Sequence, residues 1–208
     1  MRWALRDIAA SDNGVVIAQA LRDGTAVVVS DGSFKDKFGT AAWVIEGRRS
    51  DGRLEGQCII PGGPEDQSAY RSELGGLYAI AAMVQVICEL HNIQEGSIEV
   101  ACDGMNALAQ VGEADPIIRP NGAQYDIIAA TQAKIKRTNI QWKMRHVMGH
   151  QDDTQGCTVM DCWETLNCMM DERAKQHWQH HSTRTTRVQS AVDCEPWAVW
   201  TGRSKICG

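Results

Sequence analysis

The clearest local signal in the sequence is Ala26-Val27-Val28-Val29-Ser30-Asp31-Gly32-Ser33, in which a β-branched run leads into an acid and a polar turn. β-branched residues favour strands, and the Asp, Gly and Ser after them favour a turn. The sequence therefore predicts a strand at 26–30 that ends in Asp31. A single Asp at a strand end is most often a turn former, so Asp31 alone does not identify a site.

Two further short strands are predicted after this one, at 40–45 and 57–60, and the second stops at the turn that begins with Pro61. The connections are too short for crossover helices, so the three strands predict an antiparallel meander. From Tyr70 to Leu90 apolar residues recur every three or four positions. This spacing predicts an amphipathic helix.

The second half of the chain alternates between strand and helix patterns. The predicted elements are a strand at 97–103, a helix at 105–111, a loop at 112–121, a helix at 123–136, a strand at 140–147 and a helix at 163–177. The order βββαβααβα gives an α/β fold, with a mixed five-stranded sheet covered by helices. We expect one domain at 23–182, with residues 1–22 as an N-terminal arm and 183–208 as a C-terminal arm.

Composition indicates an ordinary globular protein, since 43% of the residues are hydrophobic and 23% are charged. No uninterrupted apolar run approaches the length of a membrane span, and the N-terminus mixes acids with arginines, unlike a targeting signal. We therefore expect an intracellular protein, cytoplasmic or nuclear, with no membrane partner. The net charge of −5 argues against a strong autonomous binder of nucleic acid, which is usually basic.

The eight cysteines favour buried thiols over disulfides. Cys58, Cys88 and Cys102 lie in apolar segments, where a free Cys behaves as a small hydrophobe. An alternative is a zinc site, which would combine soft and imidazole ligands from the last third of the chain: Cys157, Cys162, Cys168, His177, His180 and His181. No Cys-x-x-Cys pair occurs there, so we favour the first interpretation.

Four acids stand where this architecture would bring them together. Asp31 and Asp103 each end a predicted strand, and if these strands are parallel neighbours in register, both carboxylates emerge at the same edge. Glu73 lies in the first turn of the long helix, and Asp171 follows Asn167 by four residues on the last helix, so those two share a face. Four oxygen donors around one pocket suit Mg²⁺.

The motifs that carry these acids resemble, in order, those of the ribonuclease H family, and most closely the domain found in reverse transcriptases of retroelements. They are Ser30-Asp31-Gly32-Ser33, Tyr70-Arg71-Ser72-Glu73-Leu74, Ala101-Cys102-Asp103, Val147-Met148-Gly149-His150 and Asn167-x-x-x-Asp171-x-x-Ala174. The resemblance covers about residues 26–181, and five motifs in order are far more specific than any one of them.

The resemblance implies an endonuclease that hydrolyses the RNA strand of RNA–DNA hybrids with two Mg²⁺ ions, for which Mn²⁺ can substitute. Asp31, Glu73, Asp103 and Asp171 would bind the metal, and His150 would assist proton transfer or product departure. The products would be a 5′-phosphate and a 3′-hydroxyl. The expected contacts to the substrate come from the residues beside these acids: Gly32, Ser33, Tyr70, Arg71 and Asn167.

The sequence departs from the family pattern at two places. The segment 151–165 after His150 is longer than usual, and Gly104 and Met105 follow Asp103 where the family has Ser and a polar residue. Candidate contacts to phosphates are basic residues at the end of the third predicted helix and on the fifth predicted strand, with a solvated helix end as the alternative: Lys134, Lys136, Arg137, Lys143 and Arg145. So few contacts imply weak binding, which a tethered polymerase domain in a parent polyprotein would compensate.

Two other functions share this fold. The first is an inactive structural or connection module, but such modules typically lose the acids. The second is a DNA-cutting nuclease of the integrase or resolvase type, which would not be expected to carry the Gly149-His150 and Asn167–Asp171 patterns. Cleavage of a labelled hybrid, compared with duplex DNA and duplex RNA, separates the three.

Overall fold

The computed structural model describes residues 2–47, 52–112, 122–149 and 160–182. Its elements are β1 (Asp7–Ala10), α1 (Val15–Arg22), β2 (Ala26–Lys35), β3 (Phe38–Gly47), β4 (Arg53–Ile59), α2 (Ala69–Leu90), β5 (Ser97–Cys102), α3 (Met105–Gly112), α4 (Tyr125–Lys136), β6 (Gln141–His146) and α5 (Cys162–His181). The α/β class and a mixed sheet covered by helices are confirmed.

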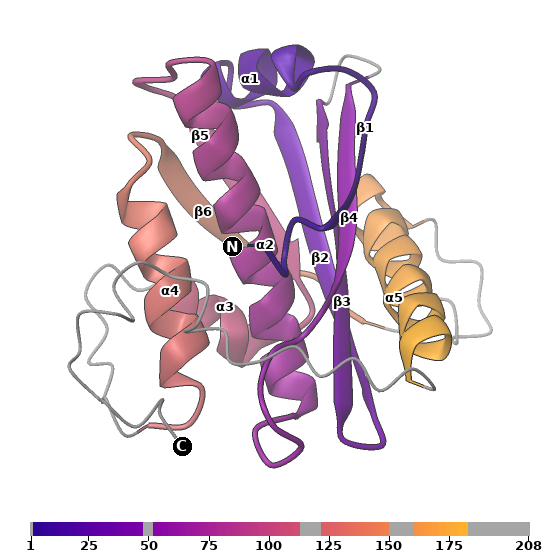
Figure 1. The fold of residues 1–208 in the computed structure, drawn as a ribbon. Helices are drawn as coiled ribbons and strands as arrows, with labels where there is room; N and C mark the ends of the chain where they lie inside the picture. The colour runs from indigo at the N-terminus through magenta and orange to yellow at the C-terminus, as the bar shows by residue number, and fades with distance from the viewer. Residues whose placement is uncertain (1, 48–51, 113–121, 150–159, 183–208) are drawn as a thin grey trace.

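The sheet has the strand order β1-β4-β3-β2-β5-β6. The predicted meander is present, because β2, β3 and β4 pair antiparallel, whereas β5 pairs parallel to β2 and β6 pairs parallel to β5. Helices α2, α3 and α4 lie on one face of the sheet and α5 lies on the other (Figure 1). The central strand β2 therefore has a helix layer on each side.

The core is divided by the sheet, as the alternation of side chains along β2 requires. Val28 belongs to the larger core beneath α2, whereas Val27 and Val29 belong to the smaller core beneath α5. Helix α2 is long and apolar enough to cross a membrane, but 78% of its apolar window is buried against the rest of the protein. This burial is typical of the core helix of a globular domain.

The sheet has six strands rather than the five predicted, because the first residues of the chain contribute one. Strand β1 pairs antiparallel with β4 at the edge of the sheet. Before and after it, Trp3 stacks on Tyr78 of α2 at 4.9 Å, and Leu21 of α1 is fully buried. Residues 2–22 thus pack on the domain. The boundaries at 23 and 182 stay a prediction, and 183–208 lies outside the described residues.

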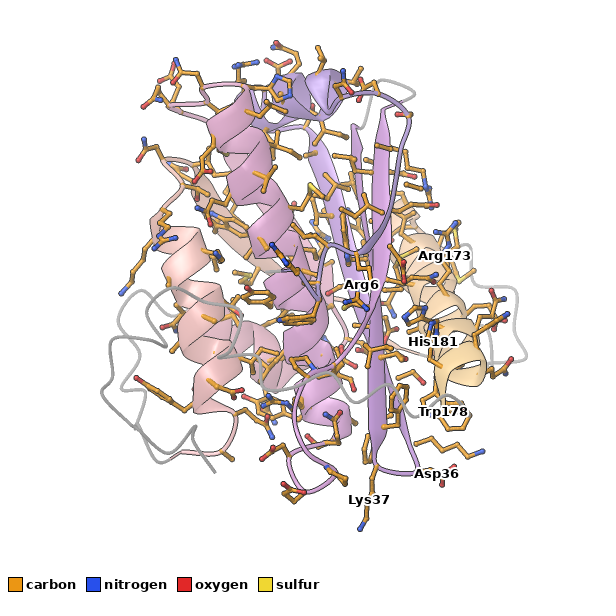
Figure 2. The ribbon with its side chains drawn as sticks, viewed as in Figure 1. Arg6, Asp36, Lys37, Arg173, Trp178 and His181 are labelled. Atoms are coloured by element: carbon orange, nitrogen blue, oxygen red, sulfur yellow. The ribbon has the colours of Figure 1, made fainter. Side chains whose placement is uncertain are left out.

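The prediction that β2 ends at Asp31 is wrong. The strand continues to Lys35, because Asp31 to Ser33 pair with Ala42 to Thr40 of β3. The hairpin turns at Asp36 and Lys37, whose φ values of 53° and 58° suit a two-residue turn. Trp178 of α5 lies beside this turn in Figure 2 and donates a hydrogen bond from its indole nitrogen to the Lys35 carbonyl at 3.0 Å. Asp31 therefore lies inside a strand between two helices.

Candidate active site

The parallel pairing of β2 with β5 places two of the predicted acids side by side. Val29 is in register with Ala101, so Asp31 and Asp103 lie two residues further along neighbouring strands. The two acids therefore lie side by side at the edge where β5 ends, as predicted, although β2 continues past this edge to Lys35. Asp31 is only 4% exposed, whereas Asp103 is partly exposed. The site therefore has a buried floor and an open side.

Glu73 is brought to this edge by the start of α2. Ser68 caps the helix by accepting a hydrogen bond from the Arg71 backbone N–H at 3.0 Å, which places Glu73 in the second turn. A Cβ atom on Gly32 would lie 2.7 Å from the Glu73 backbone nitrogen. Since a real Cβ atom does not approach so closely, glycine at position 32 lets the helix lie against β2 beside Asp31.

Helix α5 supplies the fourth acid from the opposite face of the sheet. Its capping box joins Asp161 and Glu164, and it packs along β2 and β3. Asp171 lies on this helix and forms an ion pair with Lys175, one turn later, at 2.5 Å. The charge of Asp171 acts on both Asp31 and Glu73. All four predicted metal ligands are therefore brought into one electrostatic cluster.

The cluster is strongly unfavourable for negative charge. Burial is the largest cause that raises the pKa of Asp31 to about 10, and the charges of the other three acids add to it. Burial also raises the pKa of Glu73 to about 8, followed by the charge of Asp103. Hydrogen bonds from Cys102 and from the Gly32 backbone lower the pKa of Glu73 and offset part of this rise. Without a cation, burial and mutual repulsion therefore favour the protonated forms of Asp31 and Glu73.

Asn167, another predicted substrate contact, is buried against Asp31. It is 1% exposed, and its side-chain nitrogen donates to the Asp31 carboxylate at 3.1 Å. Its side-chain oxygen is buried and has no hydrogen-bond partner among the described residues. Asn167 therefore lies behind Asp31, where it orients this carboxylate instead of facing the open side of the site.

Arg71, one of the predicted substrate contacts, is buried and paired with other residues of the protein. Arg71 is 3% exposed and donates two hydrogen bonds to the Asp126 carboxylate of α4, at 2.9 and 2.6 Å. It also donates to the Pro61 carbonyl at 2.8 Å and to the Gln124 side chain. This pairing lowers the pKa of Asp126 despite its partial burial. Arg71 ties the start of α2 to α4, so its guanidinium is already engaged.

Of the other predicted site residues, three lie near the acids and one lies outside the described residues. Gly32, Ser33 and Tyr70 are partly exposed near the acids. His150 lies outside the described residues. Its neighbour Gly149 packs against the site, because a Cβ atom there would lie 2.4 Å from a carboxylate oxygen of Asp103. The backbone at Gly149, one residue before His150, therefore lies against the Asp103 side chain.

The basic residues predicted to face phosphates are partly engaged elsewhere. Lys134 is only 4% exposed. Arg145 pairs with Glu99 at 2.8 Å and lies 4.9 Å above the Trp163 ring. Lys136, Arg137 and Lys143 are exposed.

Sequence reasoning missed Cys102 as a member of the site. The ligand atoms of Glu73, Cys102 and Asp103 all lie within 4.8 Å of one another. Strand alternation gave the signal, because Val100 and Cys102 face α2 while Ala101 faces α5. The interpretation of Cys102 as a buried thiol holds, since it is fully buried. The zinc alternative rested partly on Cys157, which lies outside the described residues.

Comparisons with known proteins agree on the fold. The sequence matches no family model and no curated protein at a significant level. LC11-RNase H1, solved with an RNA/DNA hybrid, is similar in structure with a TM-score of 0.54 and 12% identity, over 73% of this chain and 94% of that one. The N-terminal RNase H domain of Rv2228c from Mycobacterium tuberculosis has 13% identity and a TM-score of 0.49, over 76% of this chain and 96% of that one.

A foamy viral protease–reverse transcriptase, solved with an RNA/DNA hybrid, is also similar to the chain. It has 17% identity and a TM-score of 0.41, over 73% of this chain and 20% of that one. Its TM-score is too low to favour one type of ribonuclease H domain over another. The likeness to LC11-RNase H1, together with the strand order and the helix layers, gives the chain the ribonuclease H fold.

Proposed function

We propose that this protein is a ribonuclease H, a metal-dependent endonuclease that hydrolyses the RNA strand of RNA–DNA hybrids. The observation that carries the proposal is the convergence of Asp31, Glu73, Asp103 and Asp171 at one partly open edge of the sheet. Buried acids that repel each other destabilise a fold unless a cation or protons join them. In a ribonuclease H fold, such an arrangement favours a metal-dependent nuclease over a structural role.

The donor set of this cluster fits a hard divalent cation. Four carboxylates offer oxygen ligands, which Mg²⁺ and Mn²⁺ prefer. Among the described residues, Cys102 places a sulfur beside the acids, and this thiol donates a hydrogen bond to Glu73 at 3.0 Å. We propose that the four acids hold two such ions, which when bound supply the charge that activates water and stabilises the departing oxygen.

The side chains around the acids fit defined tasks in this reaction. Asn167 fixes the orientation of the Asp31 carboxylate, and Lys175 holds that of Asp171. Water adds to phosphorus, the bond from phosphorus to the 3′ oxygen breaks, and the products are a 5′-phosphate and a 3′-hydroxyl. His150 stays our prediction for the group that assists proton transfer or product departure.

Selection of the RNA strand requires contact with its 2′-hydroxyls, which the minor groove of a hybrid displays. Gly32, Ser33 and Tyr70 are partly exposed beside the acids and are our candidates for these contacts. Arg71 is omitted because its guanidinium is paired with Asp126. The complex of LC11-RNase H1 with an RNA/DNA hybrid supports a hybrid as the partner.

The acidic composition favours a tethered domain. Three of the five basic residues considered for phosphate contacts are exposed, and the whole chain has a net charge of −5. Weak binding to phosphates is tolerable where a linked polymerase raises the local concentration of hybrid. We therefore propose a domain of a retroelement reverse transcriptase that acts inside the cell, in the cytoplasm or nucleus.

The experiment that tests the proposal compares three labelled duplexes in Mg²⁺: an RNA–DNA hybrid, duplex DNA and duplex RNA of one sequence. We expect the whole chain to cut only the hybrid and only its RNA strand, because only that strand in that duplex presents 2′-hydroxyls opposite DNA. Each strand is labelled in turn and the products are resolved on a denaturing gel.

The two alternative functions, a DNA-cutting nuclease and a structural module, would give different cleavage patterns on the gel. Cleavage of duplex DNA would identify an integrase-type or resolvase-type nuclease. No cleavage of any duplex would identify a structural module of the same fold.

A further inference from the structure

Cys102 ends β5 directly beneath the candidate active site. It is fully buried, and strand alternation directs it to the α2 side of the sheet, with Val100. Asp103 is the next residue along the chain. The thiol therefore lies between the helix that carries Glu73 and the turn that carries Asp103.

Two hydrogen bonds connect this thiol to its neighbours. The sulfur donates to the Glu73 carboxylate at 3.0 Å and accepts from the Gly104 backbone N–H at 3.2 Å. The Glu73 carboxylate also accepts a hydrogen bond from the Gly32 backbone. Cys102 is thus the link between Glu73 on α2 and the β5–α3 turn.

Gly104 explains how closely these groups pack. A Cβ atom at this position would lie 2.9 Å from the Glu73 side chain and 3.3 Å from the Cys102 sulfur. The first distance is shorter than real Cβ contacts, so a side chain at 104 would displace Glu73. The departure from the family pattern at Gly104 therefore accompanies the thiol–carboxylate contact.

We propose that Cys102 is a positioning residue for the metal site, holding the Glu73 carboxylate at a fixed separation from Asp103. This inference rests on the proposed metal-dependent function. The thiol is fully buried and so does not reach the open side of the site. It acts through Glu73, because loss of the sulfur leaves that carboxylate with the Gly32 hydrogen bond and free to turn away from Asp103.

The test measures Mg²⁺ affinity of the whole chain by titration calorimetry, independently of cleavage. Cys102→Ala is expected to weaken Mg²⁺ binding by about 10-fold or more, the range seen when a group that orients a metal ligand is removed. Cys102→Ser keeps a donor at nearly the same place. We expect its Mg²⁺ affinity to lie closer to that of the parent than to that of Cys102→Ala.

The matched control is Cys58→Ala. Cys58 is also buried, at 2% exposure, and faces the same core, but it lies on β4, which β3 and β2 separate from β5. The Cys58→Ala substitution removes a similar thiol from the core, so it should lower the melting temperature without changing Mg²⁺ affinity. Equal weakening of Mg²⁺ binding by both alanine variants would show a general packing effect and overturn the proposal.

The two proposals fail separately. If the parent cuts hybrid but Cys102→Ala binds Mg²⁺ as the parent does, Cys102 is not a positioning residue and the nuclease stands. If Cys102→Ala weakens Mg²⁺ binding but the parent cuts no hybrid, the positioning role stands and the nuclease falls. A parent chain that binds no Mg²⁺ overturns both.

Discussion

Asp31→Asn is expected to reduce hybrid cleavage by about 10³-fold or more, because a bound metal contributes several kcal/mol to the transition state and each 1.4 kcal/mol changes the rate tenfold. Asp31 is the least exposed of the four acids, and the negative charges of the other three raise its pKa. Asn keeps the shape of the side chain but removes the charge that holds a cation. Initial rates at saturating Mg²⁺ measure the effect.

Asp36→Asn is the matched control for this substitution. Asp36 belongs to the same strand–turn unit but lies at the exposed tip of the hairpin, where φ is 53°. Asn adopts this left-handed conformation readily, so the hairpin should be preserved. We expect parent rates from Asp36→Asn. An Asp31→Asn rate within tenfold of the parent rate would remove Asp31 from the site.

The metal-free protein is expected to lose stability as pH rises from 6.5 to 8. Burial and mutual repulsion raise the pKa of Asp31 and of Glu73 in the folded state, whereas both titrate near about 4 in the unfolded chain. Above that value the unfolded chain has released its protons and the folded state keeps them. The folded state then binds more protons, so the free energy of unfolding falls with rising pH.

The fall amounts to at most about 1.4 kcal/mol per pH unit for each of the two groups, which lowers the melting temperature by at most about 3–6 °C per pH unit for each group. Thermal melts in EDTA measure it. Millimolar Mg²⁺ should raise the melting temperature, and do so more at pH 8, because the metal replaces the protons. Asp31→Asn should flatten the dependence on pH. A melting temperature that rises between pH 6.5 and 8 in EDTA would contradict the pKa shifts.

Local patterns predicted most of the sheet and the meeting of the acids. The β-branched run at Ala26 to Val29 and the apolar spacing of α2 each encode an element within a short window. Parallel pairing of two such strands then brings Asp31 and Asp103 together, since each acid lies two residues after a residue of the paired register, Val29 or Ala101. The position of Glu73 followed because the helix must cover the sheet.

Features set by distant partners were not predictable in this way. Strand β1 is four exposed residues without apolar alternation, and only its pairing with β4 makes it a strand. The burial of Arg71 depends on Asp126, 55 residues later in the chain. Asn167 faces Asp31 across 136 residues. Windows of local sequence contain no information on such contacts, whereas the alternation along β5 did contain the orientation of Cys102.

The metal dependence of the site is tested most directly by the rate of RNA-strand cleavage as a function of Mg²⁺ concentration, followed by excess EDTA and then by restored Mg²⁺. If the four carboxylates form the metal site of a nuclease, cleavage saturates with Mg²⁺, stops in EDTA and recovers when Mg²⁺ or Mn²⁺ is added back. The DNA strand stays intact throughout. Full cleavage of the RNA strand in excess EDTA would show that the four carboxylates are not the metal site of a nuclease.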